Sequence, residues 1–147
     1  MRALIQRIKE AEVWIDNSLH SSTGRGLLIL FGTHKNDKNE SCGFLADKAV
    51  NLRIFEDAEK KMNLSALDLG AEIMIVSQFT LYADTKKGRR PAFGDAMEPD
   101  KAEKMYDNFV RLTEASGLTV RTGVFGAKME LKFINSGPVT IMLEHGI

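Results

Sequence analysis

The chain has 147 residues, enough for one domain that buries about two-thirds of the surface its unfolded form would expose. Its 20 basic and 20 acidic side chains balance, so composition gives no overall field that would attract nucleic acid, a membrane surface or an acidic substrate. The only cysteine, Cys42, excludes a disulfide within the chain and a thiolate-rich metal site.

The N-terminal stretch "MRALIQRIKEAE" interrupts its apolar residues with polar ones, so it lacks the core of a signal peptide. No other segment is apolar enough over the length of a membrane span. We therefore expect a cytoplasmic protein that needs no membrane. Apolar and polar residues then alternate in "EVWID", and Asn17 and Ser18 are turn residues, which predicts two strands with a hairpin-like connection from residue 2 onward.

A continuous apolar run from Leu27 to Phe31 predicts a central strand that is buried on both faces. Asn36 and Asp37 are candidate N-caps for a helix from Lys38 to about Leu52, in which apolar residues recur at helical spacing. "RIFED" predicts a further strand, and residues 58–70 predict a loop.

The run "EIMIVSQFTLY", residues 72–82, predicts another core strand, although Ser77, Gln78 and Thr80 are polar. Pro99 suits the first turn of a second helix, whose apolar stripe is Ala102, Met105, Tyr106, Phe109 and Leu112 and which Gly117 can end. The stretches "LTV", "KMELKFI" and the alternating residues after Pro138 predict closing strands. The pattern indicates a mixed α/β fold, one domain over residues 1–147, with an antiparallel-rich sheet and two main helices.

The motif "SQFTL" places polar side chains at the end of a buried strand. Strand periodicity puts Gln78 and Thr80 on one face and Ser77 and Phe79 on the other. Such groups often only satisfy neighbouring backbone or cap a strand end. The alternative is one wall of a polar pocket, whose strand-end amides stabilise a developing oxyanion.

The motif "NSGPVT" sets Gly137 beside Pro138 and so makes a bare, rigid main-chain corner. On its own this is a tight turn, or a place where backbone approaches a ligand closely. The stretch "DTKKGRRPAF" is the densest basic patch of the chain, with Lys86, Lys87, Arg89 and Arg90. It is either an ordinary solvated loop or the place that binds phosphates.

Other catalytic patterns are absent from the sequence. His20, His34 and His145 lack the spacing of metal ligands, and there is no HxxxH, GxSxG or GxGxxG motif. Asp95, Glu98 and Asp100 are better explained as the loop and cap before the second helix than as an acid/base pair. Cofactor-free chemistry, or binding alone, remains, with no metal site expected.

With "SQFTL" at residues 77–81 and "NSGPVT" at residues 135–140, the chain resembles the D-aminoacyl-tRNA deacylases over nearly its whole length. "RALIQR", "RIFEDAEKKMN" and "ADTKKGRRPAF" also look like that family. Lys60 stands where the family's pattern has a turn glycine.

The resemblance implies a homodimer with active sites at the subunit interface, which hydrolyses the ester joining a D-amino acid to the 3′ end of tRNA. It implies a cis Gly-Pro bond and a corner that reaches into the partner subunit's pocket. Carried onto this chain, it assigns substrate binding and selection to the Gly-Pro corner and to the arginine that supports it. It assigns the catalytic role to the wall formed by the "SQFTL" motif. The first group is Asn135, Gly137, Pro138, Val139, Thr140 and Arg7; the second is Ser77, Gln78, Phe79 and Thr80.

In that arrangement, main-chain carbonyls of the corner hold the substrate ammonium and leave room only for hydrogen on one side of the substrate Cα, so an L side chain clashes. Glycine is not excluded by this device. Thr80 is either a nucleophile, which needs an activating base, or a positioning group beside backbone amides that stabilise the oxyanion while the substrate's ribose hydroxyl assists water. A tRNA-end or D-amino-acid binding module without turnover, and a purely structural dimer, are the competing classes.

Overall fold

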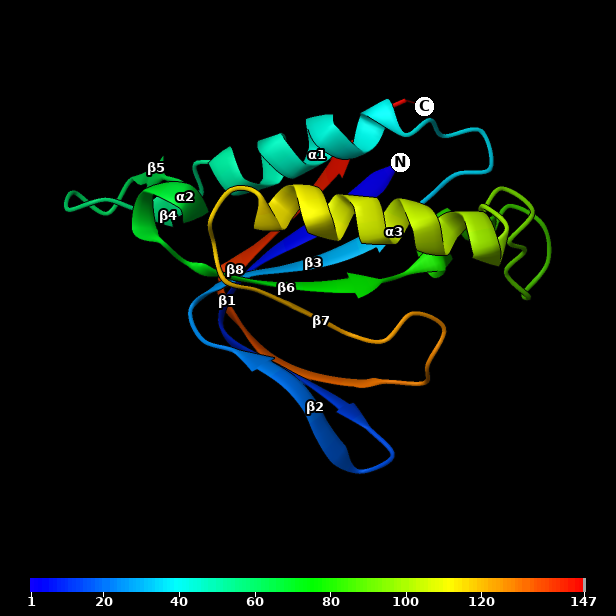
Figure 1. Ribbon diagram of the computed structural model, residues 1–147, viewed down its shortest axis with the longest axis horizontal. Coiled ribbons are helices and arrows are strands. Elements are labelled where there is room, and N and C mark those ends of the chain that lie inside the picture. The colour runs from blue at the N-terminus through cyan, green and yellow to red at the C-terminus, as the bar shows by residue number, and fades with distance from the viewer. Residues whose placement is uncertain (147) are drawn as a thin grey trace.

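The computed structural model of the chain describes residues 1–146 (Figure 1). The strands are β1 (Arg2–Ile15), β2 (Ser18–Thr23), β3 (Gly26–Gly32), β4 (Phe55–Glu56), β5 (Met62–Leu64), β6 (Glu72–Ser77), β7 (Val120–Thr122) and β8 (Glu130–Glu144). The helices are α1 (Glu40–Asn51), α2 (Ala66–Leu69), α3 (Pro99–Glu114) and the short 3₁₀ helix η1 (Phe79–Tyr82). The predicted central strand and both main helices are confirmed.

One mixed sheet organises the molecule, in the order β2-β1-β3-β6-β7, with β8 pairing to the other edge of β1. The pairs that β1 makes are antiparallel, whereas β3 with β6 and β6 with β7 are parallel. The Ser21 hydroxyl of β2 donates to the Thr122 carbonyl of β7 at 2.8 Å, so the two ends of the path meet and the sheet is nearly closed. The sheet is therefore rich in antiparallel pairing, as predicted, with a parallel half.

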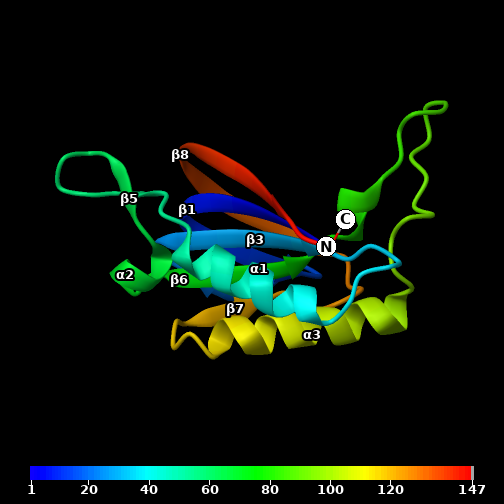
Figure 2. The ribbon, with the colours of Figure 1, turned by 90° about the horizontal axis from the view of Figure 1, so that it is seen from above.

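The helices α1 and α3 lie side by side on one face of the sheet (Figures 1 and 2). Between helices and sheet lies the larger apolar core, in which Phe31, Phe55 and Phe109 are almost fully buried. Pro99 opens α3 and the predicted stripe faces this core. A second, smaller cluster, including Ile8, fills the inside of the curled sheet. Burial on both faces makes β3 the most buried strand, which explains its uninterrupted apolar run.

Two local predictions were displaced by one to two residues. The hairpin turn is Asp16-Asn17, both at positive φ, which is the geometry that two-residue hairpins prefer, rather than Asn17-Ser18. Helix α1 begins at Glu40, and its N-cap residue is Asn39. Asp37 is not a helix cap, because its carboxylate accepts the backbone N–H of His34.

The prediction of a plain loop over residues 58–70 was wrong. This segment contains β5, which pairs with β4, and the helix α2. A capping box between Ser65 and Asp68 starts this helix. Short elements of this kind give too few residues for a periodic pattern. Lys60 has a φ of 62°, in the left-handed region that usually takes glycine, so this chain keeps the turn at the expense of some backbone strain.

The prediction that residues 72–82 form one strand was also wrong. β6 ends at Ser77, and the Gln78 N–H donates to the Phe31 carbonyl at 2.7 Å as the chain leaves the sheet. The chain then turns into η1, where the Leu81 N–H donates back to the Gln78 carbonyl. The argument that Gln78 and Thr80 share a strand face therefore fails. Their side chains meet nevertheless, because the Gln78 amide donates to the Thr80 hydroxyl.

None of the helices in the described part of the chain is long and apolar enough to cross a membrane.

Candidate active site

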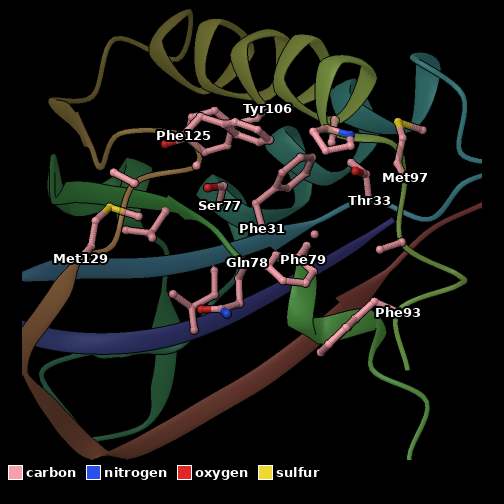
Figure 3. A pocket seen from close by; sticks show the side chains of 18 of the residues that line it. Phe31, Thr33, Ser77, Gln78, Phe79, Phe93, Met97, Tyr106, Phe125 and Met129 are labelled. Carbon is pink, nitrogen blue, oxygen red and sulfur yellow. The ribbon is translucent and has the colours of Figure 1, made fainter. Parts of the chain in front are cut away.

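A cavity of about 760 Å³ opens where β3 and β6 end, beneath the first turns of α3 (Figure 3). Its walls are mainly apolar and aromatic, with Phe31, Tyr106 and Phe125 on the side of α3. The carboxyl ends of neighbouring parallel strands are where α/β sheets usually carry their ligand sites. A mainly apolar concavity with a few polar groups is typical of a small-molecule site.

The polar groups of this cavity are few. They include the side chains of Thr33, Ser77, Gln78 and Glu98. In Figure 3, Ser77 points toward Tyr106 and Phe125, whereas Gln78 points to the other side of the strand. Glu98 is the N-cap residue of α3, as expected, but its side chain makes no cap hydrogen bond.

Tyr106 forms a fixed part of the wall. Its hydroxyl donates to the Ile75 carbonyl at 2.9 Å, and burial raises the pKa of this phenol far above its usual value. The phenol therefore stays neutral and holds α3 against β6. It closes the back of the cavity and is not poised for proton transfer near neutral pH.

The mouth of the cavity is formed by Phe79 and Phe93, whose rings meet edge to face at 4.9 Å between centroids. Phe79 is 57% exposed although it is a large apolar residue. The backbone N–H groups of Phe79 and Thr80 open η1, so neither has an acceptor within that helix, and neither donates to another described residue. The structure thus gathers Ser77, Gln78, Phe79 and Thr80 as one wall with two free donors, although Thr80 itself does not line the cavity.

The second group of predicted residues forms a separate corner. Along β1, Gln6 pairs with Thr140 and Ile8 with Asn135, so residues 136–139 bulge out of the ladder opposite Arg7. The Gly137-Pro138 peptide bond is cis, and both residues are exposed.

Side chains on both sides of this bulge hold the corner. The Asn135 amide accepts the Val139 N–H at 2.8 Å and donates to the Val139 carbonyl at 3.1 Å and to the Thr140 hydroxyl at 3.2 Å. The buried Arg7 guanidinium donates from Nε to the Ser136 carbonyl at 2.8 Å and from Nη1 to the Ile54 carbonyl at 2.6 Å. The expected contact between Arg7 and the corner is therefore present.

The wall and the corner do not meet within one chain. Ser77 is in register with Phe31 and Ala3, whereas the corner lies opposite Arg7, four residues further along β1 and on its other side. From strand spacing and rise this separation is on the order of 20 Å. The cavity is accordingly lined by wall residues and by none of residues 135–140.

The four basic residues Lys86, Lys87, Arg89 and Arg90 are all exposed, on the loop between η1 and α3. A bridge between Asp84 and Ala92 closes this loop, which projects from the body in Figure 2. Phe93 follows directly and packs on Phe79, so the basic loop starts at the mouth of the cavity.

Among the described residues, no group of three or more His, Cys, Asp or Glu side chains is placed to hold a metal ion. His145 stacks on Phe44 and hydrogen-bonds with the Ser41 hydroxyl, and Asp95 pairs with Lys35, whose hydrogen bond lowers the pKa of that carboxyl. These contacts are structural.

Sequence reasoning missed much of the cavity lining. Met129, Leu131 and Phe133 lie in the stretch "KMELKFI", for which the alternation predicted only a closing strand, although they line the cavity. Phe125 and Phe93 carry no periodic signal at all. Phe93 is an aromatic residue directly after a basic stretch, a combination that is common where proteins contact RNA, and this was the only sequence signal that it could belong to the site.

Comparisons with known proteins give the family of the chain. The family model described as D-Tyr-tRNA(Tyr) deacylase matches residues 4–144. A relative from Halothermothrix orenii named D-aminoacyl-tRNA deacylase is 54% identical over 144 residues, covering 98% of this chain and 97% of the relative. One of the same name from Thermotoga petrophila is 48% identical with the same coverage.

Solved structures share the fold. One described as c-Myc DNA Unwinding Element Binding Protein superposes with a TM-score of 0.94 at 36% identity, covering all of both chains. Another, described as a probable eukaryotic D-amino acid tRNA deacylase, has a TM-score of 0.85 at 20% identity and covers 97% of each chain. By the family model and these near full-length relatives, the chain belongs to the D-aminoacyl-tRNA deacylase family and is a hydrolase.

Proposed function

We propose that this chain hydrolyses the ester bond of D-aminoacyl-tRNA in the cytoplasm, releasing the free D-amino acid and tRNA. The observation that carries the proposal is the full-length family match, with both motifs intact and "SQFTL" at the mouth of a cavity. The reaction removes D-amino acids that were attached to tRNA in error and so acts in translation quality control.

The working unit is a homodimer whose two active sites lie at the subunit interface. In one chain the corner is exposed and about 20 Å from the wall, so neither group alone encloses a substrate. Strand β8, which carries the corner, exposes three large apolar side chains, Phe133, Ile134 and Met142, and association with a partner would bury exposed apolar side chains of this kind. In the dimer, the corner of one subunit enters the cavity of the other.

The corner selects the substrate. Its main-chain carbonyls accept hydrogen bonds from the substrate ammonium, and they stand close to the substrate Cα because the backbone there carries no side chain at Gly137. Asn135 and Arg7 fix the corner, so it does not yield when an L side chain approaches. A D side chain points away. Glycyl-tRNA meets no clash and is also hydrolysed.

The wall supplies the chemistry. A water oxygen attacks the ester carbonyl, and the free N–H groups of Phe79 and Thr80 stabilise the oxyanion that develops. The ester C–O bond then breaks, and the 3′ oxygen of the ribose leaves with the proton that the attacking water loses. The neighbouring ribose hydroxyl relays this proton. Thr80 is a positioning group that is held by Gln78, and not the nucleophile, because no basic side chain contacts its hydroxyl among the described residues.

The basic loop of Lys86, Lys87, Arg89 and Arg90 binds tRNA phosphates. It starts at the mouth of the cavity and its basic residues are exposed, which suits contact with an acceptor stem whose 3′ end enters the cavity.

The direct test is hydrolysis of matched D- and L-tyrosyl-tRNA by the purified protein against a no-enzyme control. We expect rapid release from the D substrate alone, and release from glycyl-tRNA in a parallel reaction. Binding of D-tyrosyl-tRNA without turnover would favour the binding module instead. Neither binding nor turnover by a dimeric protein would favour the purely structural role.

A further inference from the structure

A second, smaller cavity of about 300 Å³ lies beside the corner, away from the aromatic cavity. Its lining comprises Arg7, Ile8, Lys9, Arg25, Phe55, Glu56 and Ser136. Three cationic side chains thus face one carboxylate in a chain whose net charge is zero. The excess of positive charge is local and is built into a concave site.

The cations of this cavity lack counter-ions within the protein. Among residues 1–146, neither Arg7, Lys9 nor Arg25 takes part in a salt bridge. Arg7 is the most demanding of the three, because its side chain is only 8% exposed and a buried charge is costly unless it is paired.

The Arg7 guanidinium is only partly satisfied. Its Nε and Nη1 donate to the carbonyls of Ser136 and Ile54, whereas Nη2 donates to no described residue. Nη2 lies close to Gly137, since a Cβ built there would be 2.8 Å from it. The free donors of a buried guanidinium therefore stand at the junction of the corner and this cavity.

Arg25 also lines this cavity and contacts an aromatic ring. Its guanidinium lies over the Phe55 ring, 5.6 Å from the centroid, and this ring is almost fully buried. This cation–π contact keeps the exposed guanidinium of Arg25 near the buried ring, at the lining of the cavity. Lys9 is exposed and reaches the same space.

We propose that the cavity of Arg7, Lys9 and Arg25 binds a backbone phosphate of the tRNA 3′ end, while the adjoining corner selects the amino acid. This inference rests on the proposed function. A phosphodiester is the anion that this substrate carries within one nucleotide of the scissile ester, and oxygen acceptors of that kind match guanidinium donors. The phosphate completes the hydrogen bonding of Arg7 and balances the local charge.

The test compares two esters, D-tyrosyl-tRNA and 3′-O-D-tyrosyl-adenosine, which lacks any phosphate. The variant is the double substitution Lys9→Gln and Arg25→Gln, which leaves Arg7 and the corner intact. We expect its KM for D-tyrosyl-tRNA to rise roughly tenfold with kcat unchanged, because two phosphate contacts are lost. The kinetics of the adenosine ester should stay the same. The salt dependence of kcat/KM for the tRNA should become shallower by about one unit of log–log slope.

Three further variants sharpen the result. Lys9→Gln alone leaves the stacked Arg25 in place and should show part of the same KM rise. Glu56→Gln removes the one carboxylate of the cavity and should lower the KM for D-tyrosyl-tRNA. Lys104→Gln, an equal loss of charge on the exposed face of α3, should change neither substrate.

An unchanged KM for D-tyrosyl-tRNA in the double variant, with the unaltered protein active on both esters, would overturn the phosphate site and leave the proposed function standing. Equal losses on both esters would also overturn it, because the adenosine ester has no phosphate to lose. If the unaltered protein hydrolyses neither ester, the proposed function fails and this inference fails with it.

Discussion

The corner at residues 136–139 and the wall at residues 77–80 are built in opposite ways. In the corner the main chain is tied at both ends, by the Asn135 amide to Val139 and by the buried Arg7 to Ser136. In the wall the first two N–H groups of η1 are left without partners, and Phe79 is 57% exposed. A backbone that is satisfied by its own protein is rigid, whereas one with free donors is open to a ligand.

This difference fits a division of labour. Rejection of an enantiomer requires atoms that do not move, because a flexible surface would accommodate the wrong side chain. Stabilisation of a developing charge requires donors that the resting protein leaves free. The predictions below separate these two requirements.

The largest effect is expected from Gly137→Ala. A Cβ at this position would lie 2.8 Å from both Arg7 Nη2 and Val139 Cγ2, and the φ of 141° is strained for any L residue. The corner must shift, so we expect kcat/KM for D-tyrosyl-tRNA to fall by roughly a hundredfold or more, since misplacement by about 1 Å costs that much. Hydrolysis assays check this. Gly43→Ala, where an added Cβ meets nothing within 4 Å, is the matched control. Full activity of a folded Gly137→Ala protein would contradict the role of the corner.

Phe79→Pro tests the wall. Proline removes one of the two free N–H groups, and its fixed φ suits the first position of a short helix. We expect kcat to fall about 10²–10³-fold, the usual effect of losing one oxyanion donor. Phe79→Ala keeps the N–H and loses the ring, so it should retain far more turnover. Equal losses in the two variants would assign the effect to the ring and not to the amide.

Asn135→Ala loosens the corner without adding an atom. It removes the two bonds to Val139 and leaves the N–H and carbonyl of this buried residue without their partner, at a stability cost of about 1–3 kcal/mol. We expect L-tyrosyl-tRNA to be hydrolysed measurably, while activity on the D substrate falls by less than tenfold. The ratio of the two kcat/KM values is the measurement. An unchanged ratio, with stability lowered as expected, would show that the corner is rigid without this side chain.

Thr80→Ala should have the smallest effect. The Thr80 hydroxyl accepts from the Gln78 amide, so its loss frees that amide and leaves the backbone donors in place. We expect more than a tenth of the kcat to remain, as measured under saturating D-tyrosyl-tRNA. Complete loss of turnover with binding and fold intact would make Thr80 the nucleophile.

The sequence predicted the main frame of this fold because long elements carry strong patterns. The run at Leu27–Phe31 and the stripe of α3 each indicated the element that formed. The end of β6 was misplaced because "SQFTL" keeps a strand-like alternation. The strand ends because the chain turns into η1 after the Gln78 N–H has donated to the Phe31 carbonyl. The local sequence pattern carries no signal for this turn.

The candidate site was predicted in its parts and not in its assembly. The Gly-Pro pair marks an unusual backbone, but its contact with Arg7 joins residues 129 apart, and only the family resemblance indicated it. The apolar lining of Met129, Leu131 and Phe133 alternates like any half-buried strand, because apolar residues follow the same pattern whether they bury a core or line a cavity. Lys9 lies on β1 and Arg25 lies in the turn between β2 and β3, so their convergence on one cavity is visible only in three dimensions.

The central claim is that the corner of one subunit and the wall of another form each active site. Co-expression of Gly137→Ala and Phe79→Pro chains with different affinity tags, followed by isolation of the mixed dimer, tests it most directly. The account predicts that each single-variant dimer is nearly inactive and that the mixed dimer recovers about half of the unaltered activity on D-tyrosyl-tRNA, because one of its two sites is then intact. A mixed dimer as inactive as its parents would contradict the claim, since corner and wall would then act within the same chain.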